Sequence, residues 1–408
     1  MLGALAVVVS AVLPTVFPVF RFPHPGGPHA IGTLTYHWTD ATRPETLTAE
    51  SKRRRELMVQ IWYPAKADPF ALRAPYLADA DTVMSAFARI HHRPEFIFGH
   101  FRHVTTNAIP SAPAAGDQAR YPVLLFLEGV TGFRQMNTFQ VEELVSHGYI
   151  VAAIDQPGAA AAVVFPDGRK AAGLTVEQAQ AAVRPSYMPD AGAPSLIRAV
   201  SSPNSVIAYL AQDAIFTLDQ LAALNQVDPN GILTGKLDLR RAGAFGVSLG
   251  GIVVGEACRL DPRLRACLVM DAPMSTAVVK AGLQQPSMWI TRDAHSMRLE
   301  RQRAGGWPQA EIEAHQTTMR AVYQSLPGAG YFVRVPGMFH SNFMDIANWL
   351  ALGSQLGLTG PINAQRAHAI VNAYSVAFFD RHLRGQPATL LDGPAVQYPE
   401  VLFESRRP

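Results

Sequence analysis

Short apolar runs separated by helix-length segments dominate the pattern of this chain. Continuous apolar runs of this length are typical of parallel strands that are covered on both faces. We expect such strands at residues 123–127, 149–154, 242–245, 266–270, 287–291 and 331–335. Helices are expected at residues 137–147, which Gly148 closes, and at 205–224, 251–260 and 364–383. The alternation predicts an α/β protein with a mostly parallel central sheet flanked by helices.

Residues 32–38 and 57–63 instead alternate between apolar and polar positions, so we expect an antiparallel start to the sheet. Two segments, residues 158–203 and 292–327, do not fit the regular alternation. Insertions at the carboxyl ends of strands usually build the binding site, so we interpret both as cap or lid material, with plain surface decoration as the alternative. No repeat or linker divides residues 31–408, which we expect to form one catalytic domain.

The N-terminus is apolar: residues 2–20 carry no charge, a length close to the ~20 residues that span a bilayer. Pro14 and Pro18 disfavour a helix in its second half, and no basic residue precedes it as in a signal peptide. Residues 1–30 are therefore a membrane anchor, the remnant of a longer membrane segment, or a buried arm. We favour the first two, and with them a membrane-associated or exported protein over a cytoplasmic one.

Charge and cysteine content exclude several function classes. The net charge of the 408 residues is only +3, too small to indicate a nucleic-acid partner, and the basic run at residues 52–55 is interpreted as a solvated face. The two cysteines, Cys258 and Cys267, are expected to be small buried side chains. No C-x-x-C or H-E-x-x-H pattern occurs, so we predict no metal.

The sequence Gly246-Val247-Ser248-Leu249-Gly250 carries the main chemical signal. A serine between glycines, placed between a strand and a helix, is the layout of a nucleophile elbow. The glycines allow the tight turn that exposes the hydroxyl, and the Leu249 amide at the helix start faces a developing anion. The alternative for such a short pattern is an ordinary turn of small residues. We predict that Ser248 is a nucleophile.

A serine nucleophile needs a base and an acid, and both follow in the chain order Ser, Asp, His that this architecture uses. His340 lies just beyond the last expected strand, where the sheet can present an imidazole to the elbow. Asp271 and Asp293 each follow a strand, and their spacing does not decide between them as the acid. The acid would hold the imidazole in the right tautomer and stabilise the imidazolium.

The loop after residues 123–127 should supply the second oxyanion donor, and we assign it to the Val130 amide. Glu128 in the same loop would oppose an oxyanion unless its carboxylate points away or pairs with a cation such as Arg134.

These residues resemble the plasma-type platelet-activating factor acetylhydrolases (lipoprotein-associated phospholipase A2) and their bacterial esterase relatives, within the α/β-hydrolase superfamily. The matching blocks are residues 59–64 (VQIWYP), 122–134, 144–154, 246–251, 268–272 (LVMDA) and 339–345 (FHSNFMD). The resemblance implies Asp271 as the acid, Val130 and Leu249 as oxyanion donors, and calcium-independent hydrolysis of short or oxidised acyl esters without a cofactor. It also marks two departures, because Val247 and Glu128 stand where the family usually has histidine.

We therefore expect a serine carboxylic-ester hydrolase of the α/β-hydrolase fold acting on a small, lipid-like ester. A general carboxylesterase is favoured over a named acetylhydrolase because both departures alter the pocket. The same triad would serve an acyltransferase, a lactone or polyester hydrolase, or a peptidase. An inactive binding or scaffold protein is the alternative from another class, with Glu128 as its support.

Overall fold

The computed structural model describes residues 17–48, 53–189, 205–349 and 352–406. Their main sheet has ten strands in the order β12-β11-β10-β9-β8-β4-β5-β2-β1-β3. The strands are β1 (Ala30–Pro44), β2 (Arg54–Ala65), β3 (Ile109–Pro110), β4 (Tyr121–Leu127), β5 (Ile150–Asp155), β8 (Leu237–Val247), β9 (Leu264–Met270), β10 (Ser287–Thr291), β11 (Gly330–Arg334) and β12 (Leu402–Arg406).

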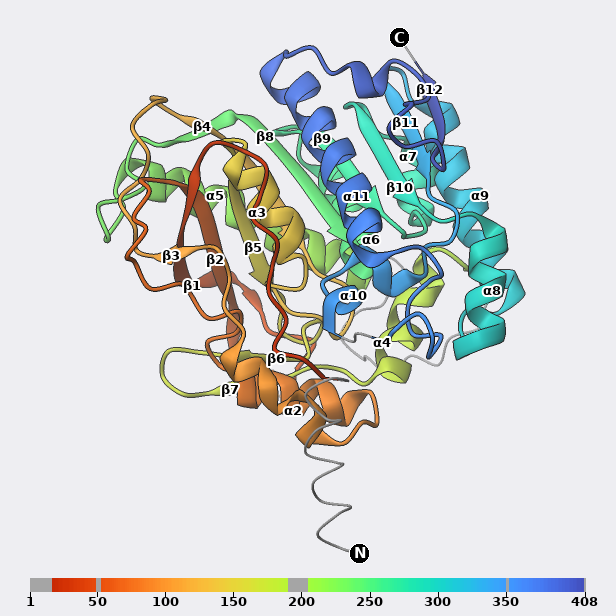
Figure 1. Cartoon of the computed structure of the whole chain (residues 1–408), viewed down its shortest axis with the longest axis horizontal. Helices are drawn as coiled ribbons and strands as arrows, with labels where there is room; N and C mark the ends of the chain where they lie inside the picture. Colours follow the sequence, from red (N-terminus) through yellow and green to blue (C-terminus); the bar gives the residue numbers. More distant parts are fainter. Residues whose placement is uncertain (1–16, 49–52, 190–204, 350–351, 407–408) are drawn as a thin grey trace, which may run out of the picture.

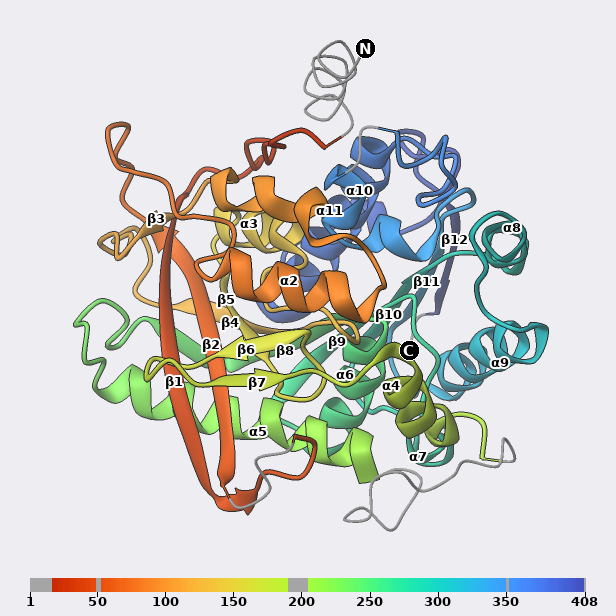
Figure 2. The same cartoon turned by 90° about the horizontal axis from the view of Figure 1, so that it is seen from below.

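The helices lie on both faces of this sheet, with α3 and α11 on one side and α5 and α6 on the other (Figures 1 and 2). Their bounds are α2 (Ala80–Ile90), α3 (Thr138–Ser146), α4 (Val176–Val183), α5 (Ser205–Gln226), α6 (Leu249–Leu260), α7 (Thr276–Ala281), α8 (Ala294–Ala304), α9 (Gln309–Ser325), α10 (Ile346–Trp349) and α11 (Ala364–Phe379). Shorter turns are η1 (Glu95–His103), η2 (Arg184–Ser186), η3 (His340–Phe343), η4 (Asp380–Arg384) and η5 (Thr389–Leu391).

The buried apolar side chains form two cores, one on each face of the central strands. Leu124 and Phe126 of β4 pack toward one core, whereas Val123 and Leu125 pack toward the other, because successive side chains of a strand point to opposite faces. All four side chains are fully buried. Covering both faces explains why residues 123–127 of β4 are apolar at every position rather than at alternate ones.

The predicted fold class is confirmed, with the central strands parallel and β1 and β2 antiparallel. Three features were not anticipated. The chain returns as β12, which pairs antiparallel with β11 at the sheet edge. A separate hairpin of β6 (Ala162–Val164) and β7 (Lys170–Ala172) lies in the first insertion. The helix expected at 364–383 is α-helical only to Phe379 and continues as the π-helical turn η4.

The N-terminal prediction falls mostly outside the described residues, since residues 1–16 are not among them. Phe20 and Phe22 are buried, and their rings contact Tyr76; the Phe20 ring also contacts Phe101. This part of the expected arm therefore packs onto the domain. Within the described ranges, no helix has the length and apolar character that crossing a membrane requires.

Candidate active site

Ser248 sits in a strained turn between β8 and α6. Its backbone angles are φ 56° and ψ −124°, and its amide donates to the Met270 carbonyl at 3.0 Å. A positive φ is unusual for serine and costs ~1–3 kcal/mol, which the surrounding packing must offset. A Cβ on Gly250 would lie 2.0 Å from the Leu127 carbonyl oxygen, and one on Gly246 would lie 2.6 Å from Gly250. The two glycines are therefore required for the elbow to close.

Asp271 follows β9 directly and is fully buried, again with a positive φ of 43°. Its Oδ2 accepts a hydrogen bond from His340 Nδ1 at 2.6 Å and another from Arg292 Nε at 2.8 Å. The Thr291 hydroxyl donates to Oδ1 at 3.1 Å. Burial alone would raise the pKa of Asp271, but Arg292 and His340 outweigh it and hold this pKa far below its ordinary value. The carboxylate is therefore ionised and held in place by three donors.

Ser248 and His340 line the same cavity, which has a volume of about 180 Å³. His340 begins η3, just beyond β11, so the loop carries the imidazole back over the carboxyl ends of the strands. No hydrogen bond joins the two side chains in the described part of the chain, and hydrogen bonds of this kind often tighten only when substrate binds. The sheet thus brings the Ser248 hydroxyl, the His340 imidazole and the Asp271 carboxylate to one edge.

The two residues predicted as oxyanion donors also line this cavity. Leu249 is the first residue of α6, where a backbone amide has no partner within the helix. The next two amides after Val130 are engaged, Thr131 with the Ala159 carbonyl and Gly132 with the Gly129 carbonyl. A Cβ on Gly129 would lie 3.2 Å from the Ser248 Cβ, so this loop runs directly beside the elbow.

Asp293, the alternative acid, has a different contact. Its carboxylate accepts from the Ser296 amide at 2.7 Å, as the N-cap of α8. The structure therefore brings Asp271, and not Asp293, to His340.

Comparison with known proteins supports the same architecture. The sequence model of the family described as platelet-activating factor acetylhydrolase, isoform II, matches residues 15–182. The chain is 23% identical over 397 residues to a platelet-activating factor acetylhydrolase of Cavia porcellus, covering 92% of this chain and 80% of the relative. It is 23% identical over 420 residues to a probable 1-alkyl-2-acetylglycerophosphocholine esterase of Arthroderma benhamiae, covering 98% and 97%.

A solved structure of a ferulic acid esterase from Streptomyces cinnamoneus is similar throughout. It superposes with a TM-score of 0.71 at 28% identity, over 94% of this chain and 99% of that one. The chain is thus similar to platelet-activating factor acetylhydrolases and to an esterase of known structure. These similarities support the family resemblance expected from the sequence motifs, and with it an enzyme that hydrolyses ester bonds.

Glu128, one of this chain's departures from the family pattern, is buried without a cation. Its Oε1 accepts from the Gln156 amide at 3.1 Å, and its Oε2 has no hydrogen-bond partner within the described ranges. Arg134, the cation considered as its partner, pairs with Asp155 instead. Burial, and then the charge of Asp155, raise the pKa of Glu128 well above its ordinary value. A neutral carboxyl does not oppose an oxyanion, which removes the objection to this residue.

Both insertions contribute to the cavity wall. Ala179 and Val183 come from α4 in the first insertion, and Trp307 and Glu311 come from the second. The edge-to-face contact of Trp307 with His340, with ring centroids 5.4 Å apart, was not predicted. Neither was Arg292, although an arginine directly after a buried strand is a usable signal, since a buried guanidinium needs an anionic partner.

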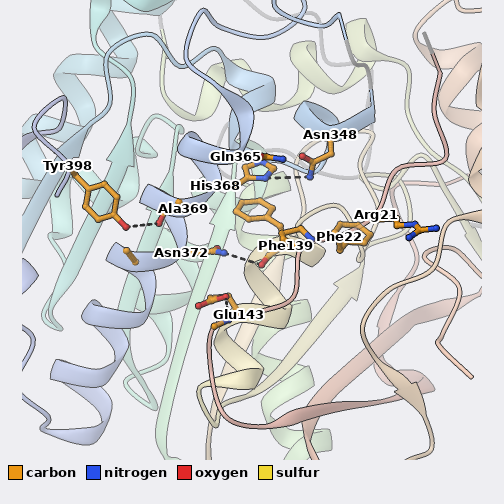
Figure 3. A pocket seen from close by; sticks show the side chains of 13 residues that line it. Arg21, Phe22, Phe139, Glu143, Asn348, Gln365, His368, Ala369, Asn372 and Tyr398 are labelled. Carbon is orange, nitrogen blue, oxygen red and sulfur yellow. Dashed lines mark hydrogen bonds between the residues drawn. The ribbon is translucent and has the colours of Figure 1, made fainter. Parts of the chain in front are cut away.

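A larger cavity of about 680 Å³ lies elsewhere, between residues 21–26, α3 and α11 (Figure 3). It shares no lining residue with the Ser248 cavity. Figure 3 shows the His368 ring lying on Phe139, with centroids 3.7 Å apart. The Nε2 of His368 contacts the Met344 carbonyl. This histidine is therefore engaged in packing, and the described residues that line its cavity include no serine, threonine or cysteine.

Proposed function

We propose that Ser248, His340 and Asp271 form the catalytic triad of a serine carboxylesterase acting on short-acyl esters. The observation that carries this proposal is the 2.6 Å contact of His340 Nδ1 with the buried Asp271, together with a cavity that both His340 and Ser248 line. A carboxylate on Nδ1 fixes the tautomer that leaves Nε2 free to accept a proton.

The proposed reaction has two halves. In the first, the Ser248 oxygen attacks the ester carbonyl carbon while His340 Nε2 takes the hydroxyl proton. The tetrahedral oxyanion accepts hydrogen bonds from the Val130 and Leu249 amides, each worth ~10²–10³ in rate. The intermediate collapses to an acyl-serine, and His340 returns its proton to the leaving alcohol. In the second half, His340 activates water, which attacks the acyl carbon and releases the carboxylic acid and free Ser248.

The small volume of the cavity favours a substrate with a short acyl group. Its volume of about 180 Å³ is below the ~300–1,000 Å³ of pockets that enclose drug-sized ligands. Val183, Ile252, Tyr187 and Trp307 present mostly apolar surface to it. The names of the relatives agree with this class, since an acetylhydrolase removes a two-carbon acyl group. A lipid-like alcohol would extend from the opening of the cavity.

The experiment is the turnover of p-nitrophenyl acetate and butyrate by Ser248→Ala, with labelling by a fluorophosphonate probe. We expect turnover and labelling to be lost, because Ser248 is the only serine, threonine or cysteine among the described residues that line the cavity. Ser325→Ala is the matched control, since the Ser325 hydroxyl only donates to the Val322 carbonyl on α9. A folded Ser248→Ala protein with wild-type turnover would refute the proposal.

We also propose that residues 2–20 associate with lipid membranes through the part that precedes the buried Phe20, because this stretch is long, uncharged and apolar. The full chain should co-sediment with phosphatidylcholine vesicles, and a variant with both Val8→Asp and Val9→Asp should stay in the supernatant. Val227→Asp, at an exposed valine after α5, is the control and should sediment like wild type. Equal sedimentation of all three proteins would contradict this role.

A further inference from the structure

A fully buried arginine lies behind the acid of the proposed triad. Arg292 follows β10, and its Nε donates to Asp271 Oδ2, the same oxygen that accepts from His340 Nδ1. The carboxylate oxygen is therefore shared between the imidazole and a permanent cation. A guanidinium cannot lose its proton in a protein, so its charge acts on this pair at every pH of interest.

The second insertion holds Arg292 in place. The Glu300 carboxylate on α8 pairs with Nη1 of Arg292, and its other oxygen accepts from the His340 amide at 3.3 Å. The Trp307 ring contacts both residues: the Arg292 guanidinium carbon lies 5.3 Å from the ring centroid, and the His340 imidazole meets the ring edge-to-face with centroids 5.4 Å apart. Arg292, Glu300 and Trp307 thus form a contiguous support behind and above the Asp271–His340 pair.

We infer that Arg292 is a positioning residue that orients Asp271 and sets the position of the acid limb in the pH–rate profile of the enzyme. This inference rests on the proposed triad. A cation beside the Asp271–His340 pair makes the addition of a proton to the pair less favourable. Removing the cation should therefore shift the acid limb of the pH–rate profile upward.

The other ionisable groups that face Asp271 do not replace this effect. His315 on α9 has its Nε2 at 3.7 Å from Asp271 Oδ1. Burial, despite the attraction of Asp271, lowers the pKa of His315 to about 3, so this histidine is neutral at the pH of the assay. Glu300 is negative and acts against Arg292, so removing it should shift the limb in the opposite direction.

The test is kcat/KM for p-nitrophenyl acetate as a function of pH, which reports the ionisations of the free enzyme. For Arg292→Gln we expect the acid limb to move up by about one pH unit, as is typical when an adjacent charge is lost. For Glu300→Gln we expect a downward shift. Arg292→Lys keeps the positive charge but loses the planar guanidinium with its forked donors. Its acid limb should therefore stay near that of the wild type, while kcat falls.

Arg320→Gln is the matched control, because Arg320 pairs with Glu404 near the edge strand β12. It should leave the limb unchanged. If Arg292 had only a structural role, replacing it would lower stability or the yield of active enzyme without moving the acid limb. An acid limb in Arg292→Gln at the same pH as in the wild type therefore overturns the inference. If that variant does not fold, a Glu300→Gln limb that fails to move down overturns it. Activity retained in Ser248→Ala would instead refute the triad itself.

Discussion

Glu128→Gln tests whether the buried carboxyl beside the oxyanion loop is protonated in the folded protein. The side chain is 1% exposed, and its unpartnered Oε2 has no cation to pair with in the described part of the chain. Keeping a charge there would cost several kcal/mol, so the carboxyl keeps its proton in the folded state. In the unfolded chain a glutamate ionises near pH ~4.3. The two states therefore bind different numbers of protons at neutral pH.

This difference in bound protons decides whether the free energy of unfolding rises or falls with pH. Above pH ~4.3 the unfolded state has lost a proton that the folded state keeps, so the free energy of unfolding falls as pH rises. The free energy of unfolding falls by about 1.4 kcal/mol per pH unit until the pH reaches the raised pKa of Glu128 in the folded state. Between pH 5 and pH 7 the fall is therefore up to about 2.7 kcal/mol. Glutamine has nearly the same shape, keeps an acceptor for the Gln156 amide and does not titrate, so Glu128→Gln should lack this fall.

The assay is urea unfolding of both proteins at several pH values between 5 and 7. We expect the stability difference in favour of Glu128→Gln to grow with pH, while esterase activity stays close to wild type because both side chains are neutral. Glu313 on α9 is exposed, so Glu313→Gln should follow the wild-type curve and serves as the control. Parallel curves for wild type and Glu128→Gln would refute the argument, as would a large gain in turnover, which would indicate that a negative charge had been removed.

Asp271→Asn should lower kcat on p-nitrophenyl acetate by about 10⁴-fold, because an amide in this position favours the wrong imidazole tautomer. Asp293→Asn should change kcat little, since asparagine caps a helix as well as aspartate does and Asp293 contacts the Ser296 amide. Measuring kcat for both purified variants decides between the acids, and the reverse ranking would contradict the assignment.

Much of the sheet could be predicted because a buried parallel strand must be apolar on both faces. Residues 123–127 are a continuous apolar run and became the core of β4, and the apolar residues 288–290 lie at the centre of β10. The edge strand β12 (Leu402–Arg406) was missed, because its Leu-Phe-Glu-Ser-Arg sequence is exposed or half-buried and has no such run. Its pairing with β11 depends on residues roughly 70 positions earlier, which no local pattern encodes.

The candidate active site was likewise predictable only in part from the sequence. The sequence by itself placed Ser248 in its elbow, since two glycines around a serine between strand and helix are a local requirement of the backbone. It left Asp271 and Asp293 open on spacing alone, because both follow parallel strands and end at the same edge of the sheet. Only the tertiary structure brought His340 to one of them, and only the tertiary structure placed Arg292 and Trp307 against that pair. Such contacts depend on how loops far apart in the chain meet in space, and the energy of a buried charge depends on those neighbours rather than on the residues beside it in the sequence.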